Sequence, residues 1–189
     1  MSGRNTTTHW GSVSQFLHWL VAGLILIQIG LGVTGKLLPR GPGLLTLIRS
    51  HKSLGITILA IAVIRLVWRW LNPVPVLPHT IPSYERGIAR LTHALLYVVL
   101  FAMPLTGWIG SAAHGTPVQW FGLFQVPSPV GKDKALSALM NQTHLYLAIF
   151  LGVVLVLHIA AALRHHFVLR DDTLQRMLPA GKPAADTVR

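Results

Sequence analysis

Residues 141–167 read NQTHLYLAIFLGVVLVLHIAAALRHHF. This run is apolar and long enough to cross a lipid bilayer as a helix. Its two interior histidines, His144 and His158, are fourteen residues apart, which in an α-helix is a rise of about 21 Å and nearly four whole turns. Their imidazoles therefore share one face, one near each membrane surface. Because an ionisable side chain inside a span is costly, each is expected to have a partner elsewhere in the chain.

Composition places the rest of the chain in the membrane as well. Of its 189 residues, 52% are hydrophobic and 11% are charged, and the mean hydropathy is +0.56. The charges lie almost wholly outside four long apolar runs, which predicts an all-α integral membrane protein, a four-transmembrane-helix bundle. In such a protein, the net charge of +11 is explained by Lys and Arg that flank spans and meet anionic lipid headgroups. We therefore expect membrane lipid as a partner, and no nucleic acid.

The chain has no cysteines. This excludes disulfides, thiolate-bound iron–sulfur clusters and the C-x-x-C-H attachment of haem. Any haem must therefore be held non-covalently by His or Met.

Breakers and polar stretches divide the chain into an N-terminal segment (1–12), a four-helix domain (13–166) and a tail (167–189). The expected spans are Val13 to Thr34, His51 to about Trp70, Leu91 to Gly110, and residues 141–167. Between them lie a loop at 36–50, a proline-rich connection at 72–82 followed by a polar stretch at 83–90, and a long connection at 111–141.

Two further segments carry their own predictions. Within the long connection, PVQWFGLFQVP (117–127) is too short to span and is expected to lie at the membrane interface. In the tail, VLRDDTLQRML (168–178) predicts a short amphipathic helix, and residues 179–189 are expected to be disordered.

Counting basic residues gives the orientation. With the N-terminus inside, ten Lys and Arg residues face the cytoplasm and six face outward. The positive-inside rule then predicts cytoplasmic N- and C-termini.

This orientation sorts the histidines by depth. His18 in the first span and His158 lie towards the inner side, whereas His51 and His144 lie towards the outer side. The pairs that can meet at one depth are His18 with His158 and His51 with His144. Two imidazoles from facing helices are what a bis-histidine haem requires, since each ring gives a nitrogen lone pair to the iron from one side of the porphyrin. The sequence therefore predicts two haem b groups with these four histidines as iron ligands.

Cations near each pair are candidates to meet the haem propionates. Arg49 and Lys52 flank the outer pair, and Arg65, Arg69 and Arg164 lie near the inner pair. Small residues leave room for a macrocycle, although glycine is common in membrane helices anyway: Gly23, Gly30, Gly32, Gly55 and Gly152.

Simpler roles exist for the same residues. A single histidine in a span is as often a hydrogen-bonding core residue as a ligand, and it is the matching depths that favour haem. His93 has the inner depth and competes with His18 or His158; a hydrogen bond to a propionate or a quinone is its expected role. His165 and His166 are expected at the interface, where cations suit the end of a helix.

Five stretches resemble the bacterial cytochrome b561 family, in order along the chain: QFLHWL (15–20), RSHKSLG (49–55), LTHALLYVVLFAMPLTGW (91–108), HIAAALRHHF (158–167) and RDDTLQRMLP (170–179). The family consists of four-span dihaem proteins of the bacterial inner membrane, related to the cytochrome b subunits of nickel–iron hydrogenases. The resemblance carries the axial ligands onto His18, His51, His144 and His158.

The resemblance also implies a function: transfer of electrons between a periplasmic donor and membrane quinone, with ubiquinone as the expected redox partner. Some members resemble superoxide:ubiquinone oxidoreductases, and the outer cations would attract an anionic donor, although they serve lipid headgroups equally well. The alternative is a membrane-anchor cytochrome b subunit that relays electrons for a partner dehydrogenase, hydrogenase or other redox protein. A transporter or proton relay built on the same histidines is a third reading, which four short-linked spans without internal repeats disfavour.

Overall fold

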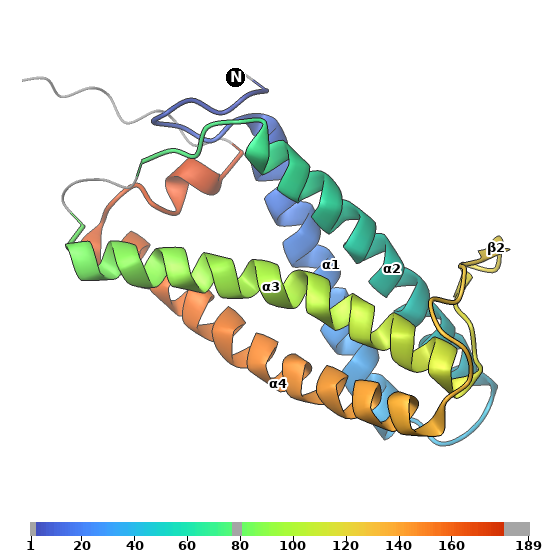
Figure 1. Ribbon diagram of the computed structural model, residues 1–189. Coiled ribbons are helices and arrows are strands. Elements are labelled where there is room, and N and C mark those ends of the chain that lie inside the picture. The colour runs from blue at the N-terminus through green and yellow to red at the C-terminus, as the bar shows by residue number, and fades with distance from the viewer. Residues whose placement is uncertain (1–2, 77–80, 180–189) are drawn as a thin grey trace, which may run out of the picture.

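The computed structural model describes residues 3–76 and 81–179, and four long helices make up most of them (Figure 1). They are α1 (Ser12–Leu37), α2 (Pro42–Trp70), α3 (Ser83–His114) and α4 (Lys134–Arg164). Each is long and apolar enough to cross a membrane, the fourth together with the turn that follows it. The predicted all-α bundle of four membrane-spanning helices is confirmed.

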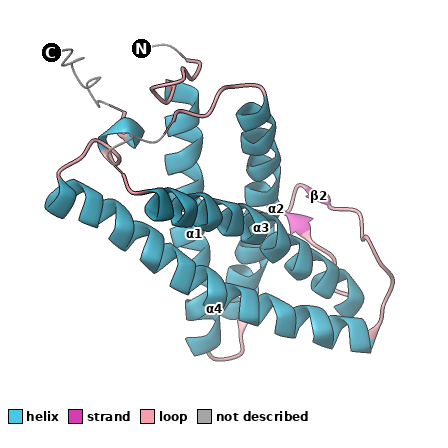
Figure 2. Ribbon diagram, turned by 60° about the vertical axis from the view of Figure 1, so that its left-hand side comes forward, coloured by secondary structure: helices cyan, strands magenta, loops and turns pink. Residues whose placement is uncertain are grey.

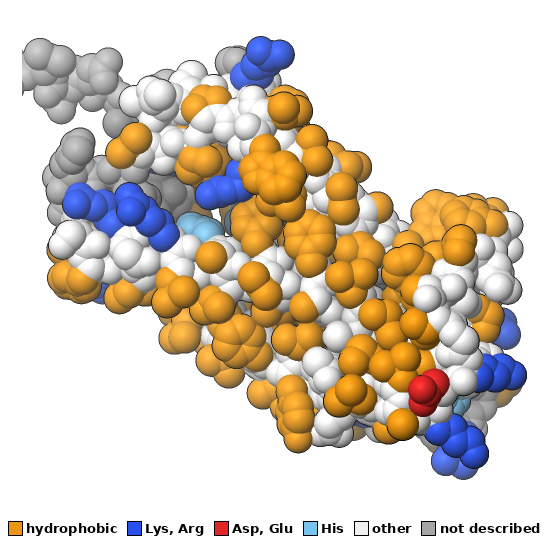
Figure 3. Space-filling view, viewed as in Figure 1, with side chains coloured by type: hydrophobic (Ala, Val, Ile, Leu, Met, Phe, Trp, Pro, Cys, Tyr) orange, Lys and Arg blue, Asp and Glu red, His pale blue; other side chains and the backbone are white. Residues whose placement is uncertain are grey.

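The helices form two packed pairs, α1 with α2 and α3 with α4, and α2 also contacts α3. The α3–α4 pair crosses the α1–α2 pair at a marked angle (Figure 2). Where the pairs meet, Val21, Ile58, Ala62 and Leu100 form a small buried core. Many other apolar side chains are exposed on the surface, as expected for a helix bundle that is surrounded by lipid (Figure 3).

The expected loop at 36–50 is wrong, because only residues 38–41 separate α1 from α2. Pro42, read from the sequence as a breaker, occupies the first turn of α2. A proline is well tolerated there, since its missing N–H would have no partner in the helix. The segment from Gly43 onward then continues the helix into the predicted second span.

Helix α3 is longer than predicted at both ends, since residues 83–90 and 111–114 are helical. Its end is set by Gly115, which has a left-handed φ of 85°. The connection to α4 is accordingly residues 115–133. It contains a short antiparallel hairpin of β1 (Gln119–Trp120) and β2 (Phe124–Gln125), in which Trp120 pairs with Phe124.

The amphipathic helix predicted for 168–178 is also wrong. After α4 the chain makes one π-helical turn, η1 (His165–Leu169), and Arg170 ends it with a left-handed φ of 56°. Asp171 then accepts hydrogen bonds from the Thr173 backbone N–H and the His165 ring, which competes with helix continuation. Up to residue 179, where the described part of the chain ends, only the 3₁₀ turn η2 (Gln175–Met177) follows. Apart from Pro179, the disorder predicted for residues 179–189 lies outside the described residues.

Candidate functional site

Two pairs of histidines face each other inside the bundle. Near one end, His51 of α2 and His144 of α4 have ring centroids 6.2 Å apart with the ring planes at 73°. Near the other end, His18 of α1 and His158 of α4 have centroids 6.4 Å apart with planes at 59°. The structure thus places side by side the same residues that depth pairs in the sequence.

The spacing within each pair fits two ligands on opposite sides of one metal. An imidazole nitrogen bound to a metal lies about 2 Å from it, so two such rings on opposite sides have centres roughly 6 Å apart. Among residues 3–76 and 81–179, no group of three or more His, Cys, Asp or Glu side chains could hold a metal ion. Two facing imidazoles suit a metal whose other ligands come from a macrocycle, as in haem.

His93 of α3 is also close to the inner pair, with its ring centroid 5.5 Å from that of His158. The sequence leaves its role open between a rival ligand and a hydrogen-bonding neighbour. In the structure, the ring of His158 contacts two histidine rings, those of His18 and His93. Among the described residues, the ring of His144 contacts one histidine ring, that of His51.

The orientation of His144 suits metal binding. Its Nδ1 lies 2.9 Å from the carbonyl oxygen of Met103 and 3.2 Å from the hydroxyl of Thr106, both on α3. A carbonyl oxygen only accepts, so the Nδ1–H donates to it. In the neutral ring this leaves Nε2 with a free lone pair, which is the way proteins commonly orient a ligating histidine.

Two glycines make room for the outer imidazoles. A Cβ on Gly107 would come within 3.2 Å of Cε1 and 3.3 Å of Nδ1 of His144, and a Cβ on Gly32 would meet Cε1 of His51 at 3.4 Å. Gly32 is among the small residues that the sequence marks, but Gly107 is not. Three others it marks, Gly23, Gly30 and Gly152, face open space.

His51 has an unsatisfied polar atom. Its Nδ1 is buried and has no hydrogen-bond partner in the described part of the chain, although its backbone carbonyl accepts from the side-chain amide of Gln28. A buried polar atom without a partner is unusual in a folded protein. Among the described residues, His51 therefore lacks the contact on Nδ1 that Met103 provides to His144.

At the inner pair, Arg65 donates to Nδ1 of His18 at 3.0 Å. Arginine cannot accept a hydrogen bond, so in this conformation His18 carries its ring proton on Nε2. His18 can bind iron through Nε2 only when Nε2 has no proton. This requires that the proton is lost, or that Arg65 takes another partner so that the proton can move to Nδ1. A propionate is such a partner, since a guanidinium binds carboxylates strongly.

The other candidate cations have diverse positions. The guanidinium of Arg69 lies over the Tyr97 ring, 5.5 Å from its centroid, and that of Arg65 lies over the same ring at 5.4 Å.

Two more of these cations bond residues outside the histidine pairs. Lys52 hydrogen-bonds the backbone oxygen and hydroxyl of Thr116 at 3.1 Å. Arg164 forms an ion pair with Glu85 at 3.3 Å, on the surface of the inner end. Of the predicted cations, Arg65 is the one bonded to a histidine of either pair.

A polar cluster that the sequence does not reveal joins the tail to α3. The His165 ring lies between two carboxylates, with Nδ1 hydrogen-bonded to Asp171 and Nε2 3.8 Å from Glu85. Burial alone would raise the pKa of Asp171, but the hydrogen bonds from His165 and Thr173 outweigh it and lower that pKa. The cluster fixes η1 against the start of α3.

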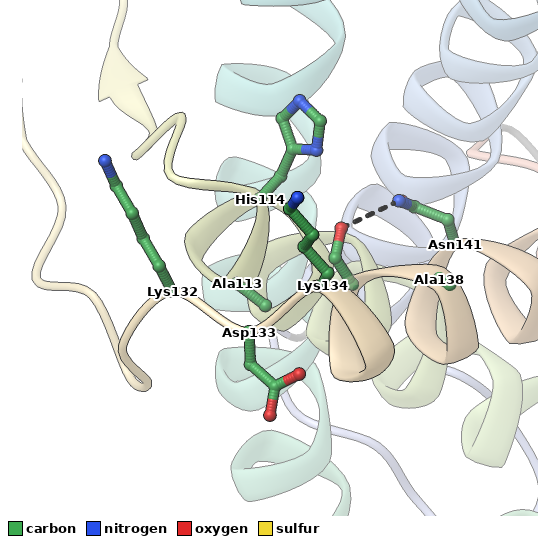
Figure 4. Close-up of a pocket in the computed structure, with 8 residues that line it drawn as sticks. Ala113, His114, Lys132, Asp133, Lys134, Ala138 and Asn141 are labelled. Atoms are coloured by element: carbon green, nitrogen blue, oxygen red, sulfur yellow. Dashed lines mark hydrogen bonds between the residues drawn. The ribbon is translucent and has the colours of Figure 1, made fainter.

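At the opposite end, a hollow lined by both polar and apolar side chains lies where α3 ends and α4 begins (Figure 4). His114, Lys132 and Lys134 supply cationic or ionisable groups to it, and Asp133 caps α4 by accepting from the Leu136 N–H. In the same hollow, Asn141 donates to Ser137 at 3.3 Å. The hollow therefore adds positive charge to the end of the bundle that holds His51 and His144.

The chain is similar to several known proteins. The family model described as prokaryotic cytochrome b561 matches residues 9–180. The chain is 37% identical to cytochrome b561 homolog 2 of Escherichia coli (strain K12), over 98% of both chains. It is 32% identical to a Yersinia pestis protein described as "Probable superoxide oxidase CybB", over 86% of this chain and 92% of that one. It is also 28% identical to cytochrome b561 homolog 1 of Escherichia coli (strain K12), over 88% of this chain and 95% of that one.

Proposed function

The chain belongs to the prokaryotic cytochrome b561 family, and on this premise we propose that it is a dihaem protein that passes electrons from an outer donor to membrane quinone. As a family member it is a multi-pass bacterial membrane protein that binds haem b and transfers electrons across the membrane. The number of haems, their ligands, the donor and the acceptor are the proposal.

The observation that carries the proposal is the presence of two facing histidine pairs, whose members on α4, His144 and His158, are fourteen residues apart. His51 and His144 would hold one haem b, and His18 and His158 the other. Bound haem b supplies one-electron oxidation and reduction at its iron. The rise of about 21 Å between His144 and His158 would place the two pairs in opposite leaflets.

Neighbouring residues hold the ligands in place. Met103 and Gly107 fix the ring of His144, and Arg65 lies beside His18, ready to bind a carboxylate. His93, close to His158, is placed to hydrogen-bond a propionate or a quinone oxygen. The quinone site would then lie beside the inner pair, although the outer pair is the other place for it.

Superoxide is the donor we propose, because a relative is described as a probable superoxide oxidase. Two superoxide anions lose one electron each and leave as O₂, while one quinone takes two electrons and two protons and becomes quinol. The outer cations, including Lys132 and Lys134, would raise the local concentration of the anion. The orientation is that of the positive-inside rule, with both termini in the cytoplasm of a bacterial inner membrane.

Proteoliposomes that contain ubiquinone and no other protein test this directly. Superoxide generated outside should reduce the quinone at a rate proportional to the amount of cytochrome, and boiled protein is the control. If quinol forms only when a partner dehydrogenase or hydrogenase is added, the chain is instead an anchor subunit, and superoxide oxidation is not its function.

A further inference from the structure

The hairpin of β1 and β2 projects sideways from the flank of α2, well short of the α1–α2 connection that ends the bundle (Figures 1 and 2). We propose that it is inserted into the membrane leaflet nearest the His51–His144 pair, where its exposed tip contacts lipid acyl chains. Location at the interface is already expected from the sequence, but insertion beside a spanning helix is a different arrangement, with its own contacts and consequences. It does not depend on the donor or acceptor of the electrons.

The contacts between the hairpin and α2 set its depth. The indole N–H of Trp120 donates to the hydroxyl of Thr57 at 3.1 Å, and the backbone N–H of Phe121 donates to the hydroxyl of Ser53 at 3.0 Å. Thr57 is six residues beyond His51 in α2, about 9 Å further into the span. Trp120 therefore reaches past the level of the outer histidines towards the middle of the membrane.

The backbone of the hairpin is suited to an apolar surrounding. Non-helical backbone at membrane depth requires internal partners for its polar groups, since lipid supplies none. Here Ser53, which is 1% exposed, donates to the Gln119 oxygen and accepts from Phe121. Leu123 N–H donates to the Trp120 oxygen, and Val126 N–H to the Val118 oxygen.

The side chains at the tip are apolar and exposed. Phe121 is 54% exposed, Leu123 74% and Phe124 55%, and the indole of Trp120 packs on both phenylalanines with centroid distances of 5.2 and 5.3 Å. Apolar side chains gather over this part of the surface beside α2 (Figure 3). An exposed aromatic cluster of this kind indicates a partner, and acyl chains are the apolar phase that surrounds a spanning helix.

The charge pattern favours lipid over a soluble partner. Residues 117–130 contain no charged side chain, whereas Lys52 is bonded to Thr116 at the base of the hairpin and Lys132 follows it. Cations that flank an uncharged aromatic segment are typical of a structure that crosses from headgroups to acyl chains.

Site-directed spin labelling tests the proposal, because a chain without cysteines accepts a single label at any position. Leu123→Cys and Phe124→Cys would carry a nitroxide in phosphatidylcholine–phosphatidylglycerol vesicles, and collision rates would be measured with O₂, which concentrates in lipid, and with a water-soluble nickel chelate. Val156→Cys, on the exposed face of α4, is the lipid control, and Lys132→Cys is the aqueous control. We expect both hairpin labels to match Val156, with O₂ collisions several-fold above those of the chelate.

Collision rates like those of Lys132 would overturn the proposal. So would labels shielded from both reagents with dipolar coupling between copies, which would make the hairpin a protein contact. A second measurement tests the anchor: Ser53→Ala should increase the mobility of the Phe124 label, whereas Ser50→Ala, at a neighbouring position of α2, should not. Equal mobility in the two variants would refute the role of Ser53. A wild-type reduced-minus-oxidised spectrum in every variant shows that the bundle is folded.

Discussion

The Nδ1 of His144 lies 2.9 Å from the carbonyl oxygen of Met103 on the neighbouring helix, which fixes the ring so that Nε2 faces away from α3's backbone with a free lone pair. The same ring lies against the bare Cα of Gly107, one turn further along α3. A carbonyl orients the ring and a glycine accommodates it, so His144 is the best prepared of the four proposed ligands.

Replacing Gly107 should therefore damage the outer site. In Gly107→Ala, the new methyl group would press on the His144 ring at 3.2 Å, and overpacking of this kind costs about 1–3 kcal/mol. We expect weaker haem retention at the outer site, measured as haem per chain after detergent purification. Gly87→Ala, whose Cβ would enter open space near the start of α3, should retain the wild-type content. Equal content in the two variants would mean that His144 is not held as the structure indicates.

Arg65 should raise the reduction potential of the inner haem. Its guanidinium, half-buried beside His18 and Tyr97, disfavours the extra positive charge of oxidised iron. Arg65→Gln should lower one of two midpoint potentials by about 60 mV or more, which is a tenfold change for a one-electron couple. Redox titration of the α band measures this shift. The control is Arg164→Gln, because Arg164 pairs with Glu85 at the surface. A shift of both potentials, or of neither, would contradict the placement of Arg65 at one site.

The outer cations should act through long-range attraction. Lys132→Gln combined with Lys134→Gln should slow superoxide-dependent quinone reduction several-fold at low ionic strength. The difference should shrink in about 1 M salt, where the Debye length is about 3 Å. Arg86→Gln, at the other end of the bundle, is the control. A salt-independent loss would indicate direct contact or misfolding in place of steering.

Acid should loosen the tail through Asp171. Because its pKa is lowered in the folded protein, its contribution to stability is fully present above the ordinary carboxyl value of 3.8 and is lost as the pH falls through the lowered value. Hydrogen exchange of residues 165–176, corrected for the intrinsic effect of pH, should therefore rise below about pH 4. In Asp171→Asn, exchange should already be faster at neutral pH and lose this acid dependence. Asp133→Asn at the opposite end should behave as wild type in this segment.

Periodicity along α4 predicts the two facing pairs, but it leaves open the part of His93, which also contacts His158. His144 and His158 share a face because fourteen residues are close to four turns, and span direction then leaves one partner of matching depth in each of α1 and α2. Both inferences use the geometry of single helices and the thickness of a bilayer, so they need no knowledge of packing.

The details around the histidines depend on packing and were not predictable. Gly107 and Met103 act on His144 across a helix interface, at a spacing that no local pattern encodes. The bond between Arg65 and His18 likewise joins residues 47 positions apart. The prediction of a loop at Pro42 is wrong because proline can start a helix as well as break one. The prediction of a helix in the tail is wrong because Asp171 bonds His165 locally in place of continuing a helix.

The most direct test of the account is the number of haems per chain in the wild type, His144→Ala and His158→Ala, from dithionite-reduced minus oxidised spectra and a pyridine haemochrome assay. We expect two b-type haems in the wild type and about one in each variant, with the loss in a different spectral component of the α band each time. A wild type with one haem or none, or two haems that survive both substitutions, would contradict it.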